Sequence, residues 1–447
     1  MVEQNEMAQG TTRWYGIAKR SGKEVLENMS YQLTQAQQAA LDHITDYALG
    51  RESAAQQVLA EIRAMCDISD GDYREAVLSL KRHARIALHF HPDRLVHTGV
   101  TVAESLLAQG MYTNQFESGI SNGSVTAYPG GQRDLWERQL FGGAYHSEVR
   151  SGGSSESRSG GSEFRSGESG DSGRLGSGGG ESDESGGVGS DESDESGDLR
   201  DRDSGFDGSE RPKYGALDLM LHPDGPSPRF GSCYLLLKPS VSERATFTYL
   251  DSHQLPEEKC TYRAFDGMMA AILRDAFLAD FAVGERNLTP PRLIAHLRER
   301  LAAPVAERLR GQPARNLNHY VEAQVHGSVS LAEDAEALVA DPSFRGTPAG
   351  AALEQLCQSY RLALHWHSGF AMDAAEVPPD FRGRAMPSLA ARIAEGGRVD
   401  AARIGAAAVD VRRHPERWQD RGEPAQVLQE LKLLWHVLVR FGEQASG

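Results

Sequence analysis

Apolar side chains recur at helical spacing in the first part of the chain. Between residues 34 and 83 they return every three or four positions, which places them on one face of a helix. Thr34 and Gln37 resemble a capping box at the start of the first of these helices. The pattern predicts an N-terminal helical region over 1–83, with helices over about 39–48, 54–65 and 73–83.

The pattern changes to that of strands in the middle of the chain. Residues 84–91 form a largely apolar stretch that must end at Pro92, because proline cannot continue a regular element. Residues 110–145 mix turn-forming residues with aromatic ones, which favours short strands and loops. Further elements are predicted as strands over 216–221, 230–237, 244–250 and 320–327, and as helices over 265–282 and 291–309.

A long acidic segment interrupts this strand-rich region. Residues 147–210 contain 17 acidic and 6 basic residues, so they carry −11 of the formal charge of −16. They have almost no apolar side chains to offset the entropy of ordering, about 1–2 kcal/mol per residue for the backbone alone. We interpret the segment as a disordered insert within one domain, because strand patterns resume directly after it.

These patterns together predict an α+β fold with a mixed or antiparallel central β-structure between helical terminal regions. The first part of the α/β domain covers 84–146 and the second part covers 211–330, on either side of the insert. The last region, 331–447, is predicted to be mainly helical. It closes with an amphipathic segment, 427–441, that packs on the rest of the domain.

Composition limits the setting in which the chain works. Outside the insert the net charge is only −5, which leaves no surplus of Lys and Arg for nucleic acid or anionic lipid. The four cysteines lie far apart without a CxxC pair, and no apolar run is long enough to cross a bilayer. We therefore expect a cytoplasmic protein with no membrane partner.

Two histidines before Pro92 are the first candidates for chemistry. If their segment is extended, His89 and His91 face the same side, because side chains alternate along a strand. The block resembles the HxH motif of amidohydrolase-type metal enzymes, and its HPD part resembles the J-domain of Hsp40 co-chaperones. Further imidazole ligands for a metal would be His253, His326, His365 and His367. A purely structural role for one of the pair is the third reading.

Hydroxyl and guanidinium groups follow the histidines. QFESGISNG, 115–123, presents two serines and an Asn-Gly turn after an aromatic residue, and GGQRDLWE, 130–137, presents Arg133 beside two glycines. A guanidinium binds phosphate through two parallel hydrogen bonds, which makes Arg133 a candidate phosphate contact. The alternative is a structural hairpin with a solvated arginine.

A polar strand face is predicted late in the α/β domain. Tyr320, Glu322 and Gln324 share one face of the strand at 320–327, opposite an apolar face. A glutamate in this position is either catalytic or part of the charged rim of a half-exposed strand. The residues DSH at 251–253 end another predicted strand, where site residues often gather.

Taken together, these blocks resemble an uncharacterised bacterial group, the domain-of-unknown-function 3626 family. The resemblance covers most of the chain outside the insert, and its motifs are HFHPDR, ISNG, GGQRDLWE, RPKYGAL, PRFGSCY, TFTYLDSH, EAQVHG, DPSFRGT and DFRG. The family name implies no activity.

The order of the polar blocks is more distantly similar to that of the ADP-ribosyltransferase superfamily. Those enzymes bind NAD with a His or Arg on an early strand, a Ser-containing strand after an aromatic residue, and a late glutamate. The resemblance implies that Glu322 is the catalytic carboxylate. It assigns NAD binding to His89, His91, Arg94, Phe116, Ser118, Ser121, Asn122 and Arg133. Arginine-modifying members carry a second carboxylate two residues earlier, where this chain has Tyr320.

The leading hypothesis is therefore an NAD-dependent, ADP-ribosyltransferase-like enzyme with no metal in its site. It would cleave the nicotinamide–ribose bond of NAD, its substrate, and transfer ADP-ribose to an unknown protein, nucleic-acid or small-molecule acceptor. One alternative is a metal-dependent hydrolase built on His89 and His91. The other is a non-enzymatic chaperone-partner or scaffolding module that uses HPD and the acidic insert.

Overall fold

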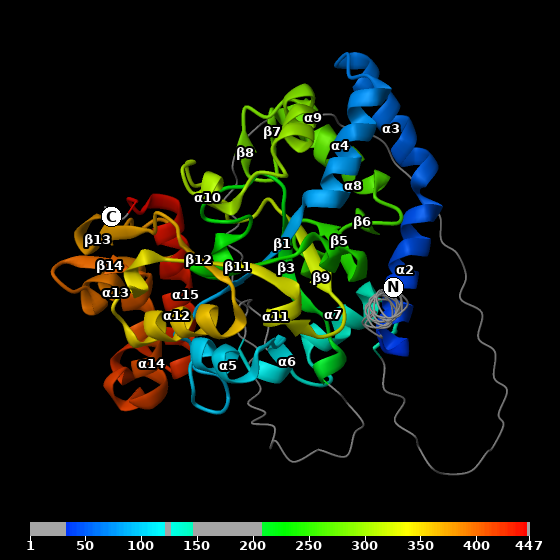
Figure 1. The fold of residues 1–447 in the computed structure, drawn as a ribbon. Coiled ribbons are helices and arrows are strands. Elements are labelled where there is room, and N and C mark those ends of the chain that lie inside the picture. Colours follow the sequence, from blue (N-terminus) through cyan, green and yellow to red (C-terminus); the bar gives the residue numbers. More distant parts are fainter. Residues whose placement is uncertain (1–32, 121–126, 146–207, 445–447) are drawn as a thin grey trace, which may run out of the picture. The chain divides into compact units, whose positions relative to one another are not determined.

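A mixed β-sheet lies at the centre of the computed structural model, which describes residues 33–120, 127–145 and 208–444 (Figure 1). Its strands are β1 (Arg85–Phe90), β3 (Lys213–Asp218), β4 (Cys233–Leu237), β5 (Ala245–Tyr249), β6 (Lys259–Thr261), β9 (Val321–Val325), β11 (Ala335–Ala340) and β12 (Ala363–Trp366). Within the described residues, these eight strands follow the order β12-β11-β4-β1-β3-β9-β5-β6. β11 and β12 are parallel and the other neighbours are antiparallel, which confirms the predicted fold class.

Helices and short strand pairs surround this sheet. The short pairs are β2 (Met111–Tyr112) with β10 (Val329–Ser330), β7 (Phe281–Ala282) with β8 (Glu285–Arg286), and β13 (Ala371–Asp373) with β14 (Arg398–Asp400). The helices are α2 (Gln35–Gly50), α3 (Glu52–Met65), α4 (Asp70–His83), α5 (Val102–Gln109), α6 (Gln115–Ser118), α7 (Gln132–Leu140), α8 (Asp266–Ala279), α9 (Pro290–Glu299), α10 (Val305–Arg308), α11 (Leu331–Asp334), α12 (Pro348–Tyr360), α13 (Met386–Ile393), α14 (Ala401–Arg413) and α15 (Pro424–Phe441). In the described ranges, no helix is both long and apolar enough to cross a bilayer.

The three N-terminal helices confirm the helical spacing of the sequence. α2 begins with the predicted capping box: Gln37 N donates to Thr34 Oγ1 at 3.3 Å, and Thr34 N donates to Gln37 Oε1 at 3.0 Å. α3 packs on α8 and α4 packs on α9, whereas α12 to α15 gather at the other end of the sheet (Figure 1). The buried positions of α4 include Ala76 and Leu80, which are four residues apart, as an amphipathic helix requires.

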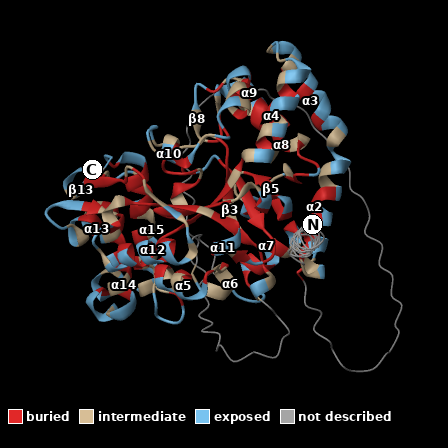
Figure 2. Cartoon of the chain, viewed as in Figure 1, coloured by how far each residue is buried: buried red, intermediate tan, exposed pale blue. Residues whose placement is uncertain are grey.

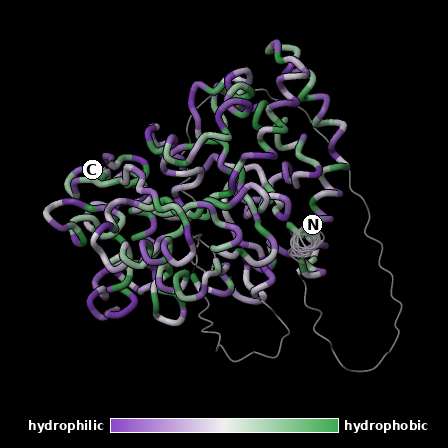
Figure 3. The backbone as a smooth tube through the Cα atoms, in the orientation of Figure 1, coloured by the Kyte–Doolittle hydropathy of each residue, from purple (hydrophilic) through white to green (hydrophobic). Residues whose placement is uncertain are grey.

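One face of the sheet supplies the main hydrophobic core. Leu88, Leu235 and Val321 are fully or almost fully buried there with apolar residues of the surrounding helices. The central strands are buried throughout, whereas the outer turns of the helices are exposed (Figure 2). Hydrophobic stretches likewise run through the interior and hydrophilic ones through the peripheral loops (Figure 3). Apolar burial on this face provides the main driving force for folding.

The opposite face, which we call the site face, carries polar residues at its centre. Glu322 of β9 lies opposite Ala216 of β3 and Thr248 of β5, and Ala216 lies opposite Ala87 of β1. Residues directly opposite each other share a face, and so do residues two apart on one strand. His89 therefore projects from the same face as Glu322, although more than 200 residues separate them in sequence.

Residues 110–145 are more helical than the sequence predicts. The Asn114 side chain caps α6, because its Oδ1 accepts hydrogen bonds from Phe116 N at 2.8 Å and Glu117 N at 3.1 Å. Gly119 ends that helix with φ 67°, a left-handed conformation that favours glycine. Gly131 precedes α7, so Arg133 lies in the first turn of a helix and not in a hairpin. Residue types that start and stop turns also cap helices, so the same pattern suits turns and short capped helices.

The C-terminal region combines the predicted helices with two strands. α12 to α15 are helical as expected, but β11 and β12 extend the sheet beyond residue 330. All residues of β11 except Glu336 are buried, and its sequence AEALVA shows no alternation of polar and apolar positions. Fully buried strands lose this alternation, so periodicity cannot separate them from helical segments.

Buried ion pairs join the two parts of the domain across the acidic insert. The predicted insert, 147–210, lies outside the described residues except for 208–210, which form a short 3-10 turn, η1 (Gly208–Glu210). The described residues before and after it belong to one compact unit. Arg211 forms ion pairs with Asp134 and with Glu137 of α7, the latter at 3.0 Å. All three side chains are buried, so these pairs fix the chain after the insert to the helix before it.

We expect Arg211→Met to lower the free energy of unfolding by about 3 kcal/mol, because the buried carboxylates of Asp134 and Glu137 each lose one of two cationic partners. Urea denaturation monitored by circular dichroism measures this change. Arg51→Met is the matched control: its guanidinium pairs with Glu257 at 3.1 Å, but both side chains are about half exposed or more (47% and 75%). The control should cost at most about 1 kcal/mol. Equal losses in the two variants would show that the buried pairs do not hold the domain together.

Candidate active site

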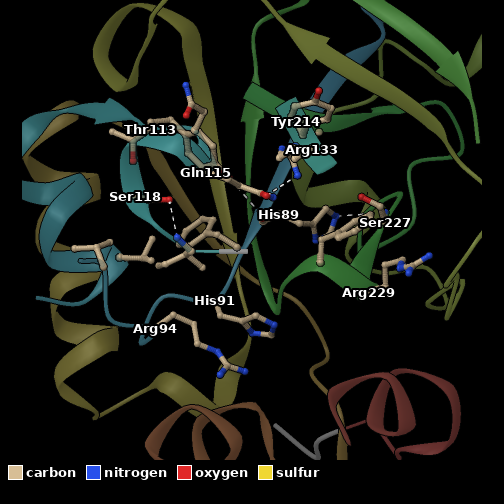
Figure 4. A pocket seen from close by; sticks show the side chains of 18 of the residues that line it. His89, His91, Arg94, Thr113, Gln115, Ser118, Arg133, Tyr214, Ser227 and Arg229 are labelled. Carbon is tan, nitrogen blue, oxygen red and sulfur yellow. Dashed lines mark hydrogen bonds between the residues drawn. The ribbon is translucent and has the colours of Figure 1, made fainter. Parts of the chain in front are cut away.

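A pocket opens over the site face of β1, β3 and β9 (Figure 4). One wall consists of α5, β2, the following residues 113–120 and α7. The other wall consists of η2 (Pro228–Phe230) and the end of β5 at residues 251 and 253. With its solvent-filled mouth the pocket contains about 1280 Å³ of empty space, enough for a ligand of nucleotide size.

Glu322 lines the pocket and belongs to a row of hydrogen-bonded polar side chains. Gln324 Nε2 donates to Glu322 Oε1 at 2.9 Å and to Thr248 Oγ1 at 3.2 Å. Thr246 Oγ1 in turn donates to Gln324 Oε1 at 2.8 Å. The polar face of β9 is therefore buried and hydrogen-bonded, and it is not the charged rim of a half-exposed strand. This network holds the Glu322 carboxylate in one orientation toward the pocket.

The environment of Glu322 favours its protonated form. Burial, reinforced by the negative charge of Asp251, raises the pKa of Glu322 to about 7. The neighbouring Ser252 hydroxyl, the Gln324 amide and the charge of Arg133 act in the opposite direction. No salt bridge to Glu322 is formed within the described part of the chain, so the ionised carboxylate would face the pocket without a direct cationic partner. Perturbed carboxyl groups in a pocket are characteristic of functional sites.

A second carboxylate reaches the pocket from a different strand. Asp251 Oδ1 lies 2.7 Å from His253 Nδ1, and Tyr320 donates its hydroxyl hydrogen to Asp251 Oδ2 at 3.2 Å. Burial would raise the pKa of Asp251, but the hydrogen bond and charge of His253 outweigh it and lower that pKa. The same contact raises the pKa of His253. The pocket therefore contains one carboxyl group, Asp251, that ionises readily and one, Glu322, that stays mainly protonated up to about pH 7.

His89 is a neutral imidazole with both ring nitrogens engaged. Its Nδ1 donates to the Gly231 carbonyl at 3.1 Å, which leaves Nε2 to accept from the Ser227 backbone N–H at 3.4 Å. Burial lowers the pKa of His89 to about 3. Gly225 has φ 75°, and a side chain there would lie 2.5 Å from His89 Nε2. His89 thus lines the pocket in a fixed orientation, as a positioned neutral ring.

His91 and the HPD sequence follow β1, and the His91 ring lines the pocket (Figure 4). His91 Nδ1 lies 3.4 Å from Ser232 Oγ, and its ring packs edge-on against Trp435 of α15 with centroids 5.6 Å apart. His91, Pro92 and Asp93 are all buried, and a strand precedes them. A J-domain needs this tripeptide in an accessible loop between helices, so the geometry gives no support to that comparison.

Arg133 projects into the pocket but is held by its neighbours. Its Nε donates to Glu137 Oε1 at 3.2 Å and its Nη1 to Gln115 Oε1 at 2.5 Å. The guanidinium lies over the rings of Tyr214 and Trp136, at 4.4 and 4.6 Å from their centroids. Two of its five N–H donors are in use and aromatic rings flank the guanidinium, so Arg133 is held in place as part of the pocket wall.

The remaining predicted residues divide between the pocket, its surroundings and the part not described. Ser118 lines the pocket at the end of α6, where its Oγ accepts from Ile120 N at 3.3 Å. It lies on a helix and not on the strand that the superfamily comparison implies. Phe116 lies outside the pocket lining, with its ring 5.1 Å from the Arg211 guanidinium. Ser121 and Asn122 lie outside the described residues.

The imidazoles proposed as metal ligands do not converge. His326 contacts Tyr145 and Thr246, and His367 contacts the Ser232 carbonyl at 2.9 Å, so both serve the interior. Across residues 33–120, 127–145 and 208–444, no three His, Cys, Asp or Glu side chains are grouped as a metal ion requires. Because the nitrogens of His89 also contact backbone groups, the pair His89 and His91 is not arranged for metal binding.

Several pocket residues had no sequence signal of their own. Tyr112, Trp136, Tyr214 and Arg229 line the pocket from separate elements. Three of them lie in or beside the motifs GGQRDLWE, RPKYGAL and PRFGSCY, which mark the family resemblance. In the sequence, the aromatic residues look like ordinary core positions. The periodicity of a strand or helix does not distinguish a residue that lines a pocket from one that lies in the core.

The chain belongs to the family described as Protein of unknown function (DUF3626), whose profile matches residues 85–179 and 192–441. The match begins at β1 and includes every described residue of the pocket. No curated protein is detectably similar to the chain. The family description gives no activity, so the function must be argued from the chemistry of the pocket.

We expect Glu322→Gln to stabilise the protein at pH 8, by on the order of 2 kcal/mol, and to have little effect near pH 5. In the wild type, the folded protein binds the Glu322 proton more tightly than the unfolded chain does, so protonation of Glu322 stabilises the fold. This contribution to stability is complete at low pH and is lost as pH rises from about 4.5 through about 7, where the buried charge forms. Urea denaturation of wild type and variant at both pH values measures the difference. A variant that is less stable than wild type at pH 8 would contradict the buried, unpaired charge.

Proposed function

We propose that this protein is an NAD-dependent, ADP-ribosyltransferase-like enzyme with Glu322 as its catalytic carboxylate. The observation that carries the proposal is the convergence of His89, Ser118, Arg133 and Glu322 on one pocket. They come from β1, α6, α7 and β9, which lie on both sides of the acidic insert in sequence. They follow the order expected for a site that binds NAD.

The chemistry needs a fixed negative charge on one side of a sugar. When the bond between nicotinamide nitrogen and ribose C1 breaks, the bonding electrons leave with nicotinamide and the ribose becomes an oxocarbenium ion. An ionised Glu322 would stabilise that positive charge, and the Gln324 hydrogen bond would orient it. The acceptor then forms a bond to C1 and loses its proton.

The walls of the pocket suit the flat rings of NAD. Tyr112, Trp136 and Tyr214 line the pocket with aromatic rings, and the Arg133 guanidinium lies against the last two. His89 is neutral and fixed, so in this proposal it positions the nicotinamide ribose and takes no proton. Arg133 orients the aromatic wall. The acceptor stays open among protein, nucleic acid and small molecule, and a cytoplasmic location stays an expectation from composition.

The two other candidate functions have less support. A metal-dependent hydrolase would need ligands that the described residues do not group together. A chaperone-partner role would need an accessible HPD sequence, and that sequence is buried. A scaffolding role for the insert has no bearing on the pocket. NAD chemistry therefore remains the function that the geometry favours most.

We expect purified wild-type protein to release nicotinamide from NAD and Glu322→Gln to reduce that rate by at least about 100-fold, because the amide cannot stabilise the oxocarbenium ion. Chromatographic quantification of nicotinamide measures the rate. Glu333→Gln is the matched control, since it makes the same change at an exposed carboxylate on α11. Full activity in the Glu322 variant, or no NAD cleavage by wild type with any added acceptor, would refute the proposal.

We also expect turnover to rise roughly tenfold between pH 6 and pH 8, since Glu322 must lose its proton to act and its pKa is raised to about 7. Gln324→Met should shift this rise in turnover to higher pH. The hydrogen bond that it removes favours the charged carboxylate, so its loss raises the pKa of Glu322 further. The measurement is kcat/KM for NAD against pH in both proteins. A flat profile in wild type would argue that another group limits the reaction.

A further inference from the structure

Two arginines of the pocket lining, from separate elements, both lie near a lysine of α15. Arg94 follows β1, Arg229 belongs to η2, and Lys432 belongs to α15. Arg94 and Arg229 line the pocket, and Figure 4 shows Arg94 beside His91 on the side toward the C-terminal helices. Lys432 is close enough to both arginines for their charges to act on it. Of these three residues, only Arg94 is among those that the superfamily resemblance assigns to NAD binding.

Well-defined contacts hold these elements together. Trp435 Nε1 of α15 donates to the Pro228 carbonyl at 2.7 Å, and His436 Nε2 donates to the Arg229 carbonyl at 3.2 Å. The Trp435 ring also packs against His91 at the end of β1. α15 is thereby fixed to both η2 and β1, and the positions of the three cations are set by the core of the domain.

The protein compensates the charges of this cluster only in part. Within the described residues, neither Arg94, Arg229 nor Lys432 forms a salt bridge. Arg229 has one hydrogen bond, from Nη1 to Asn318 Oδ1 at 3.1 Å, and its buried Nε has no partner. The negative charge of Asp251 acts on Lys432 and Arg229 without a salt bridge to either. The negative charge of Asp93 acts on the adjacent Arg94, although the Asp93 carboxyl lies against Gly405 of α14.

Such an arrangement is unfavourable in the absence of a ligand. Burial, together with the positive charges of Arg229 and Arg94, lowers the pKa of Lys432 to about 8. His91 and His436 stay neutral beside these cations, because burial and the surrounding positive charge lower their pKa values. A polyanion in the pocket would offset this repulsion and satisfy the open guanidinium donors.

We propose that Arg94, Arg229 and Lys432 form an anion subsite that holds the diphosphate group of a dinucleotide in the pocket. Two phosphates present several acceptor oxygens, which match two guanidinium forks and one ammonium. Glu322 then faces the ribose and the cations face the diphosphate. The identity of the dinucleotide as NAD rests on the proposed function, whereas the binding of a diphosphate by these residues does not.

Isothermal titration calorimetry on the full chain tests the subsite with three ligands: ADP-ribose, inorganic pyrophosphate and nicotinamide riboside, which has no diphosphate. We expect wild type to bind ADP-ribose and pyrophosphate, and to bind nicotinamide riboside at least about tenfold more weakly than ADP-ribose. Arg229→Gln and Lys432→Gln should each weaken ADP-ribose binding by about tenfold or more. Pyrophosphate binding without ADP-ribose binding would assign the subsite to free diphosphate and overturn the dinucleotide part of the proposal.

Two controls keep the test specific. Arg413→Gln removes an exposed positive charge from α14 and should leave ADP-ribose affinity unchanged. Arg229→Lys retains the charge and should bind ADP-ribose better than Arg229→Gln. Circular dichroism and thermal melting establish that each variant is folded. Unchanged ADP-ribose affinity in both Gln variants, or no binding of either diphosphate by wild type at millimolar concentration, would overturn the subsite.

The same proteins separate this proposal from the proposed function. If wild type binds ADP-ribose through Arg229 and Lys432 but never cleaves NAD, the subsite stands and the transferase proposal fails. If Glu322 is required for NAD cleavage while KM for NAD is the same in wild type and both Gln variants, the transferase proposal stands and the subsite fails.

Discussion

The register of β9 between β3 and β5 is the constraint on which the rest of the site depends. Side chains alternate along a strand, so Val321, Ala323 and Val325 enter the main core only if Glu322 and Gln324 face the other side. A shift by one residue would place a carboxylate in the apolar core. The hydrophobic effect therefore fixes the direction of the Glu322 side chain indirectly, through the burial of the apolar residues on either side of it in β9.

The walls of the pocket depend on contacts between segments that are remote in sequence. Asn114 caps α6 and also donates through Nδ2 to the carbonyls of Gly208 and Arg211, at 2.7 and 3.1 Å. Arg211 in turn pairs with acids of α7, the helix that carries Arg133. One buried polar network thus joins both sides of the insert to a pocket wall. A long insertion is tolerated at this position because its two ends are fixed by buried contacts.

Charge is distributed unevenly within the pocket. Glu322 and Asp251 lie at the ends of neighbouring strands, whereas Arg94, Arg229 and Lys432 lie toward α15. Within the described residues no salt bridge joins the two groups, and Glu322 on one side and Arg94 and Arg229 on the other line the pocket. A substrate with a developing positive charge at one end and phosphates at the other would complement this division.

The sequence by itself determined the types of most elements and several residues of the pocket. Periodicity identified α2 to α4, β9 and α15, because one face of each element is apolar and the other is not. It failed for β11, which is buried almost throughout, and for α6 and α7, whose caps resemble turns. His89, Arg94, Ser118, Arg133 and Glu322 were identified as functional candidates, and all of them line the pocket.

The tertiary structure alone decided which of these side chains remain open to a ligand. Arg133 is committed to Glu137 and Gln115, whereas Arg229 and Lys432 are not paired, and such partners depend on long-range packing that local residue patterns do not encode.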